Sequence, residues 1–466
     1  MLPIEYTIKE HVENANASDF DSAAFAEKVS KKLHSIQKEY SPFITLQGNF
    51  ELPKRKGSLY DVPIAVKDNL CTSGMRTTAG SKILDNYVPQ FDAISVSRAK
   101  LEGGMIVGKT AMDEFGFGSF STNCAYSIPK NPLDKDRTCG GSSGGAAAVV
   151  AAADFPIASI AESTGGSITC PAAFTGTVGI TPTYGRVSRW GLVDYASSLD
   201  KVGVVAKHVH DAALILRVIS GLDELDTTSS GREVPDYAED ASHPIEKARL
   251  AVPKEYFGEG VDDDVSKEVW RAIKLLESNG YTYEEVSLPS TDVALPAYYI
   301  ISMTEASTNL AKFSGLRYGM QSPIEGNADH YFAKVRSEFF GEEAKRRIIL
   351  GTYMRMAGYR AKYYLKAMQI RTKIINEFKQ HFKKFDAVIA PSMPVIPPKF
   401  SEISEMQPVN EYMMDILTVA PNLAGMPTIS LPFGKVGKFP IGVQLIADHF
   451  EESKLLGIAA KLEVLS

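Results

Sequence analysis

Two neighbouring stretches, CGGSSGGAAAVVAAA (139–153) and ASIAESTGGSITCPAAFTGTVG (158–179), hold the most unusual sequence of this chain and decide its fold class. The first predicts a glycine-rich loop that runs into an alanine-rich helix. The second predicts a strand that is followed by a loop of small residues. Loops, helices and strands that alternate in this way are typical of an α/β sheet covered by helices.

The same alternation extends outward in both directions. Short apolar runs rich in β-branched residues predict strands, and helical stretches with glycine-rich turns separate them. These runs are Val62–Val66, Met105–Val107, Pro156–Ile160, Leu250–Val252, Ala387–Ala390, Thr428–Leu431 and Ile441–Ile446. One long helix is predicted from Asp262 to Gly280, because acids begin it, apolar residues recur on one face and a glycine ends it.

The first 57 residues differ in texture from the rest. They predict an amphipathic helical segment, with a helix start at Ser18-Asp19, that packs on one compact domain formed by residues 58–466. The acidic segment 222–244 predicts either a boundary or a long surface excursion.

Composition and charge exclude several classes of protein. The chain has 466 residues and a net charge of −6, which argues against generic nucleic-acid binding. No run approaches the ~20 apolar residues of a membrane span, and the first residues resemble no export signal. The four cysteines form no CxxC pair. We therefore expect a cytoplasmic protein that does not contact a membrane.

One segment has the opposite charge balance. Residues 331–385 carry fourteen Lys or Arg and four Glu. This predicts a basic helical surface, which either is simply solvated or contacts RNA or an acidic partner.

The two glycine-rich stretches predict a reactive serine. A phosphate loop would end in GK[ST] and a hydrolase elbow would read GxSxG, and both patterns are absent. Small residues before Ser167 let backbone N–H groups approach a developing oxyanion, so Ser167 is a candidate nucleophile. No Ser-His-Asp arrangement is visible. The candidate base is Lys67, which follows an apolar strand where burial favours the neutral amine, although such a lysine is more often solvated.

Three features of the sequence carry a family resemblance: Lys67, GGSSGG (140–145) and TGGSI (164–168). With them, the chain resembles the amidase signature family over residues 58–450. The resemblance implies a large mixed β-sheet covered on both faces by helices, and a Ser–cis-Ser–Lys triad that cleaves amides. It implies that Ser167 is acylated, that Ser142 relays protons after a cis Gly141–Ser142 bond, and that Lys67 is the base. It places the oxyanion hole at the backbone N–H groups of Thr164, Gly165, Gly166 and Ser167.

Within that family, further blocks resemble the glutaminase subunits of tRNA-dependent amidotransferases. They include GKTAMDEFGFGS (108–119), EASTNLAKFSGLRYG (305–319) and KRRIILGTY (345–353). They imply that Arg347 and Asp415 hold the α-carboxylate and α-amino groups of glutamine, with Tyr298 as a weaker candidate.

The same blocks imply partners. B and C subunits would join this chain, and charged tRNA would bind mainly through the partner. ATP and Mg²⁺ would belong to the partner subunit, and this chain would hold no cofactor.

The sequence departs from the family pattern beside the nucleophile. Where the family has DTGGSIR, Ser163 and Thr169 replace the acid and the base. Their joint loss predicts an exchanged supporting set of side chains, because losing both members of a buried ion pair costs less than losing one. Two alternatives stay open: a free-standing amidase for small amides, and a non-catalytic assembly protein that retains the fold.

One extra residue between the serine pair and Ser167 is a second departure, and it makes the choice of Ser142 over Ser143 less secure. The spacing from Lys67 favours Ser142. Asp68 would oppose a neutral Lys67, unless its side chain points to the other face of the strand.

Overall fold

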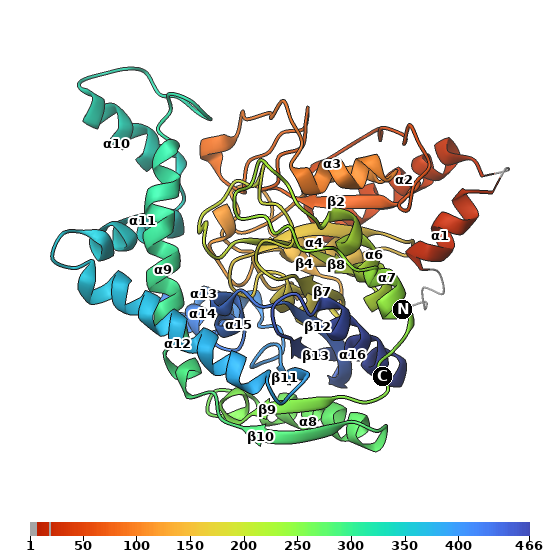
Figure 1. The fold of residues 1–466 in the computed structure, drawn as a ribbon. Coiled ribbons are helices and arrows are strands. Elements are labelled where there is room, and N and C mark those ends of the chain that lie inside the picture. The colour runs from red at the N-terminus through yellow and green to blue at the C-terminus, as the bar shows by residue number, and fades with distance from the viewer. Residues whose placement is uncertain (1–6, 18–19) are drawn as a thin grey trace.

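A single mixed sheet of eleven strands runs through the computed structural model, which describes residues 7–17 and 20–466 (Figure 1). The predicted helix start at Ser18-Asp19 lies outside the described residues. In spatial order the strands are β1 (Phe43–Leu46), β3 (Met105–Thr110), β2 (Pro63–Lys67), β6 (Ala158–Ser163), β8 (Lys201–Ala206), β7 (Val178–Thr181), β12 (Thr428–Val436), β13 (Phe439–Ile446), β11 (Ala387–Pro391), β9 (Arg249–Pro253) and β10 (Thr282–Val286). A separate hairpin joins β4 (Lys130–Asn131) and β5 (Asp134–Thr138).

The sheet confirms the predicted fold class. All seven predicted strands are present, and β2 lies parallel to both β3 and β6. The sequence reading missed β1, β7, β8 and β10. β1 lies inside the segment predicted to be helical. Its FITL sequence forms a strand because it pairs with the free edge of β3.

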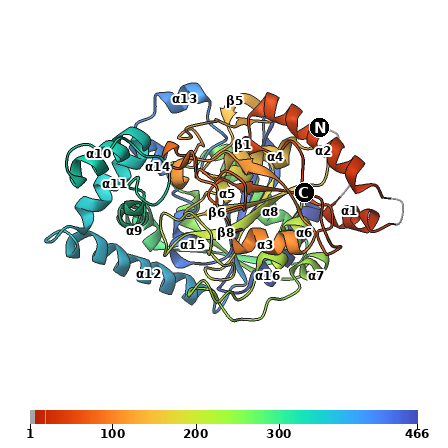
Figure 2. The same cartoon turned by 90° about the horizontal axis from the view of Figure 1, so that it is seen from above.

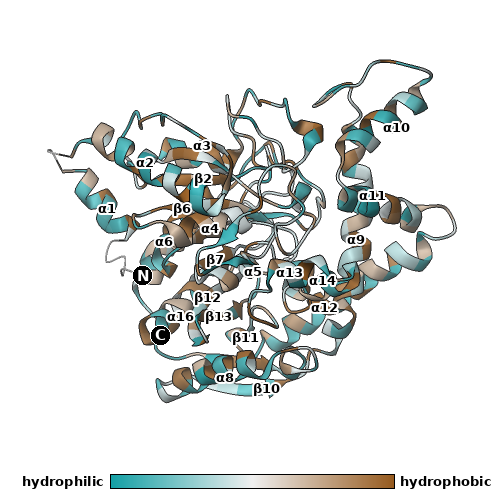
Figure 3. Cartoon of the chain, turned by 180° about the vertical axis from the view of Figure 1, so that it is seen from behind, coloured by the Kyte–Doolittle hydropathy of each residue, from teal (hydrophilic) through white to brown (hydrophobic). Residues whose placement is uncertain are grey.

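Helices cover both faces of the sheet (Figures 1 and 3). Successive residues of a strand point to opposite faces, so Ile64 and Val66 enter one apolar core and Ala65 enters another. The first core is closed by α3 (Ile94–Leu101), α6 (Val209–Ile219), α8 (Asp263–Ser278) and α16 (Glu452–Leu465). The second is closed by α2 (Ser22–Tyr40) and α4 (Gly144–Ala152). Helix α8 confirms the helix predicted over Asp262–Gly280.

The remaining helices are short or lie toward one end of the sheet. They are α1 (Ile8–Ala15), α5 (Thr169–Thr175), α7 (Tyr237–Ser242), α9 (Ala294–Asn309), α10 (Ala328–Phe339), α11 (Glu342–Arg355), α12 (Lys366–His381), α13 (Phe400–Ser404), α14 (Pro408–Met413) and α15 (Val419–Ala424). Short 3-10 segments are Lys82–Leu84, Glu114–Gly116, Lys254–Phe257, Pro289–Val293 and Leu310–Lys312, and a π-helical turn spans Ala361–Leu365. Seen from above, α1 and α2 lie at the end of the molecule opposite α9–α12 (Figure 2).

The N-terminal helices contact the body of the protein directly. The backbone N–H of Ile8 donates to Asp211 in α6 at 2.9 Å, and Val29 and Leu33 of α2 are buried against the second core. The division at residue 57 stays a prediction. The acidic segment 222–244 is a surface excursion that includes α7, since one sheet contains strands from both sides of it.

The basic segment forms α10, α11, the π-helical turn and α12. Some of its cations are structural: Arg336 and Arg371 donate to backbone carbonyls of neighbouring elements. Others, such as Arg355 and Arg360, are exposed. Solvation and partner binding both stay open for this surface. Among the described residues, the structure has no helix long and apolar enough to cross a membrane.

Candidate active site

The ends of two parallel strands bring the predicted lysine and its surroundings together. Lys67 is the last residue of β2, and Glu162 lies near the end of the neighbouring β6. The Lys67 Nζ donates to Ser142 Oγ at 2.8 Å, to the Glu162 carbonyl oxygen at 2.8 Å and to Glu162 Oε2 at 3.0 Å. Lys67 and Ser142 are fully buried. The lysine therefore contacts the serine that it would have to deprotonate.

The glycine-rich loop places the two serines of its pair differently. The Gly141–Ser142 peptide bond is cis, as the family resemblance implies. Ser142 faces Lys67, whereas the Ser143 hydroxyl donates to the Glu162 carbonyl oxygen at 3.0 Å. The Ser143 N–H donates to the Ser167 carbonyl oxygen at 3.2 Å, which ties the two loops together. This arrangement favours Ser142 over Ser143 as the relay.

Ser167 lies in the loop between β6 and α5, and its side chain keeps a 7% exposed fraction. The backbone N–H groups of Gly165, Gly166 and Ser167 donate no hydrogen bond within the described part of the chain. A Cβ on Gly166 would lie 2.4 Å from Thr418 Oγ1, and one on Gly165 would lie 2.8 Å from the Tyr298 hydroxyl. The loop is therefore closely covered and presents consecutive unused donors, as an oxyanion hole requires.

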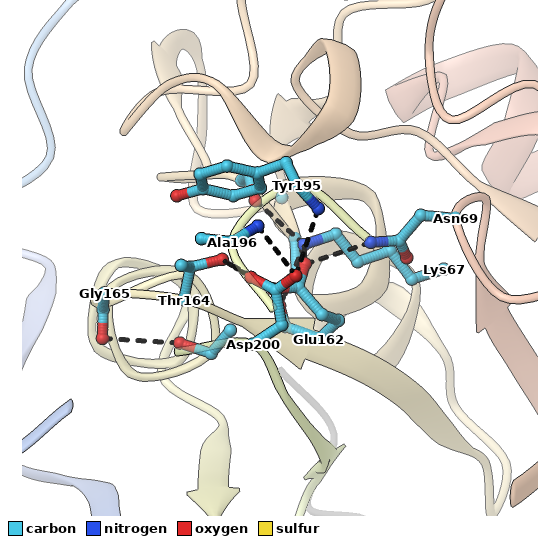
Figure 4. A network of polar contacts seen from close by, with 12 residues as sticks. Lys67, Asn69, Glu162, Thr164, Gly165, Tyr195, Ala196 and Asp200 are labelled. Carbon is cyan, nitrogen blue, oxygen red and sulfur yellow. Dashed lines mark hydrogen bonds and ion pairs between the residues drawn. The ribbon is translucent and has the colours of Figure 1, made fainter. Parts of the chain in front are cut away.

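An acidic network lies directly behind this loop (Figure 4). The Glu162 carboxylate accepts hydrogen bonds from Lys67, from Asn69 at 3.0 Å and from the Thr164 hydroxyl at 2.8 Å. The same hydroxyl lies 2.8 Å from Asp200 Oδ1, and Asp200 Oδ2 accepts from the backbone N–H groups of Tyr195 and Ala196. Burial, followed by the charge of Glu162, raises the pKa of Asp200 well above its usual value.

The residues expected to bind a substrate form a cluster of rings and charges. Asp415 accepts hydrogen bonds from the Tyr299 hydroxyl at 2.7 Å and from Ser119 at 3.1 Å. Burial raises the pKa of this carboxyl, and Arg347 partly offsets that effect. The Arg347 guanidinium lies over the rings of Phe117 and Tyr299 and donates to Glu343 at 2.7 Å.

Arg347 and Asp415 are therefore brought to the same tyrosine, Tyr299, without forming an ion pair in the described structure. Tyr298, the neighbouring residue of α9, lies over Gly165 and pairs with the Tyr195 hydroxyl at 2.9 Å. The sequence reading named Tyr298 and missed Tyr299. The spacing of residues along the sequence does not reveal that Tyr298 contacts Tyr195 while the adjacent Tyr299 contacts Asp415.

Asp68 does not share the environment of Lys67. It accepts hydrogen bonds from Thr78 and lies 3.7 Å from the buried ammonium of Lys109. Lys109 in turn donates to the Leu70 carbonyl oxygen at 2.5 Å and to Thr77 at 2.8 Å. Asp68 is thus paired with a second lysine.

The side chains at the two positions that depart from the family pattern donate hydrogen bonds to the backbone of the serine loop. The Ser163 hydroxyl donates to the Gly165 carbonyl oxygen at 3.4 Å, and the Thr169 hydroxyl donates to that of Gly166 at 3.3 Å. Sequence reasoning missed the acid that does lie here, Glu162. Its only signal was a carboxylate in an otherwise small and apolar strand.

Within the described ranges no group of three His, Cys, Asp or Glu side chains is arranged to hold a metal ion. The four cysteines are free, and three of them are buried.

Comparisons with known proteins identify the family of this chain. The sequence profile of the family described as Amidase matches residues 14–456. The chain is 45% identical over 446 residues to the glutamyl-tRNA(Gln) amidotransferase A subunit of Geobacillus sp., covering 93% of this chain and 91% of that protein. It is 47% identical over 408 residues to the A subunit of the same enzyme from Methanococcoides burtonii, covering 87% and 85%. The crystal structure of the corresponding A subunit from Thermotoga maritima superposes with a TM-score of 0.83 at 37% identity, over 98% of this chain and 94% of that one.

Proposed function

This chain belongs to the amidase signature family, and we propose that Lys67, Ser142 and Ser167 are its catalytic triad. The chain is the amidase-signature subunit of a glutamyl-tRNA(Gln) amidotransferase, and it acts there as a glutaminase. The observation that carries the proposed triad is the 2.8 Å hydrogen bond from Lys67 to Ser142, in a loop tied to Ser167 by the Ser143 N–H.

The proposed proton path begins at the contact between Lys67 and Ser142 and continues to Ser167. Neutral Lys67 accepts the hydroxyl proton of Ser142, and Ser142 accepts the hydroxyl proton of Ser167. The Ser167 oxygen attacks the side-chain amide carbon of glutamine and forms a C–O bond. The C–N bond then breaks, and ammonia leaves with a proton that returns from Lys67 through Ser142. Water attacks the resulting γ-glutamyl ester, whose hydrolysis releases glutamate and restores Ser167.

Backbone donors would hold the charge that develops on the amide oxygen. The unused N–H groups of Gly165, Gly166 and Ser167, with that of Thr164, are the proposed oxyanion hole. Removing one such donor costs roughly 10²–10³ in rate. Arg347 is the proposed partner of the glutamine α-carboxylate and Asp415 that of the α-amino group, because a guanidinium grips a carboxylate in two places. Tyr298 would close the pocket over Gly165.

The ammonia is used elsewhere in the assembly. We propose that it passes to a B subunit, which uses ATP and Mg²⁺ to convert Glu-tRNA(Gln) to Gln-tRNA(Gln), and that a small C subunit joins the two. Charged tRNA would bind mainly through the B subunit. The assembly would work in the cytoplasm, where charged tRNA is used.

The test is glutamine-dependent ammonia release, measured first for the purified chain and then with its B and C subunits and charged tRNA. Weak activity alone, stimulation by the partners and loss of at least about 10³-fold in Ser167→Ala are expected. Turnover of simple aliphatic amides without a partner effect would instead identify a free-standing amidase. Full ammonia release by Ser167→Ala would overturn the proposed nucleophile.

A further inference from the structure

We propose that Glu162 is a positioning residue for Lys67. Two oxygens of Glu162 accept N–H bonds of the amine, so that the remaining position on the nitrogen faces Ser142. The Glu162 carboxylate also supplies the negative charge that stabilises the lysine cation formed during the reaction. This inference rests on the proposed triad. It concerns an acid one position before the place where the family pattern has one.

The geometry around the amine supports the positioning role. Lys67 Nζ has three polar neighbours, of which two, the carbonyl oxygen and Oε2, belong to Glu162 and the third is Ser142 Oγ. The ammonium form donates its third N–H to Ser142 Oγ, as the structure records. Once that proton has left, the neutral amine has two N–H bonds and one lone pair. When both oxygens of Glu162 accept those N–H bonds, the lone pair points at the Ser142 hydroxyl, as a base requires.

The charge of Glu162 acts during the reaction. When the Ser142 proton arrives on Lys67, an ammonium forms in a site that contains no bulk water, since Lys67 is fully buried and Glu162 is 1% exposed. A carboxylate at 3.0 Å stabilises that cation and keeps its own charge throughout. The same carboxylate also stabilises the ammonium before the reaction.

A proton count in the network indicates that Glu162 is the ionised acid. The Thr164 hydroxyl lies 2.8 Å from both Glu162 Oε1 and Asp200 Oδ1, but a hydroxyl donates only one proton. One of the two acids must therefore donate to Thr164. Asp200 is the better proton donor, because Glu162 Oε2 already accepts from Lys67 and Asn69, whereas Asp200 has no cationic partner in the described part of the chain and burial raises its pKa (Figure 4). Thr164 then donates to Glu162 and holds it toward Lys67.

Other charged groups near Lys67 are accounted for. Asp113 acts on Lys67 through space, and burial raises the pKa of Asp113 to about 6, while the N–H groups of Ser121 and Asn123 bind its carboxylate. Asp68 and Lys109 pair with each other on the far side of β2. Glu162 is the carboxylate in direct contact with the amine among the described residues.

The experiment follows Ser167 itself, so it does not depend on recognition of glutamine. A fluorophosphonate reagent phosphonylates a deprotonating serine with loss of fluoride, and its rate is measured against pH for wild type, Glu162→Gln and Glu162→Asp, with mass spectrometry of the Ser167 peptide. The acidic limb of this profile is the pH range over which the labelling rate rises to its plateau. In Glu162→Gln we expect this limb to move to lower pH by about 1–3 units. The plateau rate is expected to fall about 10-fold or more, because the cation loses its counter-charge.

Glu162→Asp separates charge from position. It keeps the charge but withdraws it by one methylene, so the limb should stay close to that of wild type while the plateau falls. The matched control is Glu452→Gln, another buried carboxylate, which binds the Thr183 N–H at 2.8 Å and, within the described structure, makes no hydrogen bond to Lys67. It should lower thermal stability and leave the limb in place. Thermal unfolding of each variant checks that it is folded.

Each outcome decides something. A limb that does not move in folded Glu162→Gln, with or without a lower plateau, would mean that Glu162 is only structural and would overturn this inference alone. No labelling of Ser167 in the wild type would overturn the proposed triad itself. Normal labelling without ammonia release from glutamine would leave this inference standing and overturn the proposed substrate.

Discussion

At the scale of single residues, the proton on Asp200 can be tested by one substitution. In Asp200→Asn the amide oxygen can accept the N–H groups of Tyr195 and Ala196, and the amide N–H can donate to Thr164, which copies the protonated acid. We expect Asp200→Asn to retain the wild-type position of the acidic limb and activity within a few fold.

The matched substitution is Asp200→Ala, which removes both sets of hydrogen bonds. It should lower the unfolding temperature and the rate together, because buried donors and acceptors are left without partners. Ammonia release and thermal unfolding are the measurements. An Asn variant as impaired as the Ala variant would show that Asp200 is ionised in the folded protein.

At the scale of elements, α9 and α11 pack so closely that one glycine decides their spacing. A Cβ on Gly351 would lie 1.8 Å from the Met303 carbonyl oxygen, so Gly351→Ala must push the helices apart. We expect a loss of about 1–3 kcal/mol in the free energy of unfolding. Arg347 lies one turn earlier on α11, so the KM for glutamine should rise as well.

Urea unfolding and ammonia-release kinetics check this expectation. The control is Gly231→Ala, since nothing lies within 4 Å of a Cβ at Gly231 and its φ is not in the left-handed region. Equal unfolding free energies for the two variants would contradict the packing argument.

At the scale of the whole molecule, buried acids make stability depend on pH. Burial raises the pKa of Glu114 from 4.5 to about 7, although Ser81 and the Gly341 N–H bind its carboxylate. The folded protein therefore holds a proton that the unfolded chain releases, and stability falls as the pH rises from about 4.5 to about 7. Glu114 alone contributes roughly 3 kcal/mol to that loss.

Thermal unfolding between pH 4.5 and 8 measures the effect. Glu114→Gln should flatten the decline, whereas Glu259→Gln on the exposed surface should leave it as in wild type. A decline of the same size in Glu114→Gln would assign the pH dependence to other buried acids.

The sequence predicted much of this molecule, and the exceptions have physical causes. Long apolar runs and short motifs are local, so most strands and the positions of Lys67, Ser142 and Ser167 could be read from them. Glu162 and Asp200 could not, because their partners depend on the register of neighbouring strands, in which Val66 lies opposite Ile160 and Ser163 opposite Lys201. Strand β8 was missed because its KVGVVA sequence merges with a polar turn and the helix that follows.

The hydrogen bonds of Arg371 limit which substitutions the basic surface tolerates. This arginine on α12 donates to the Leu423 carbonyl oxygen at 2.7 Å, to Ser198 Oγ at 2.9 Å and to the Ser198 carbonyl oxygen at 2.9 Å. It thus fastens the loop before Asp200 and the helix beside Thr418 to the same point. A lysine has no planar fork and would reach these acceptors poorly. Replacement of Arg371 would therefore release both the loop before Asp200 and helix α15, whereas replacement of an exposed cation of α12 would break no such link.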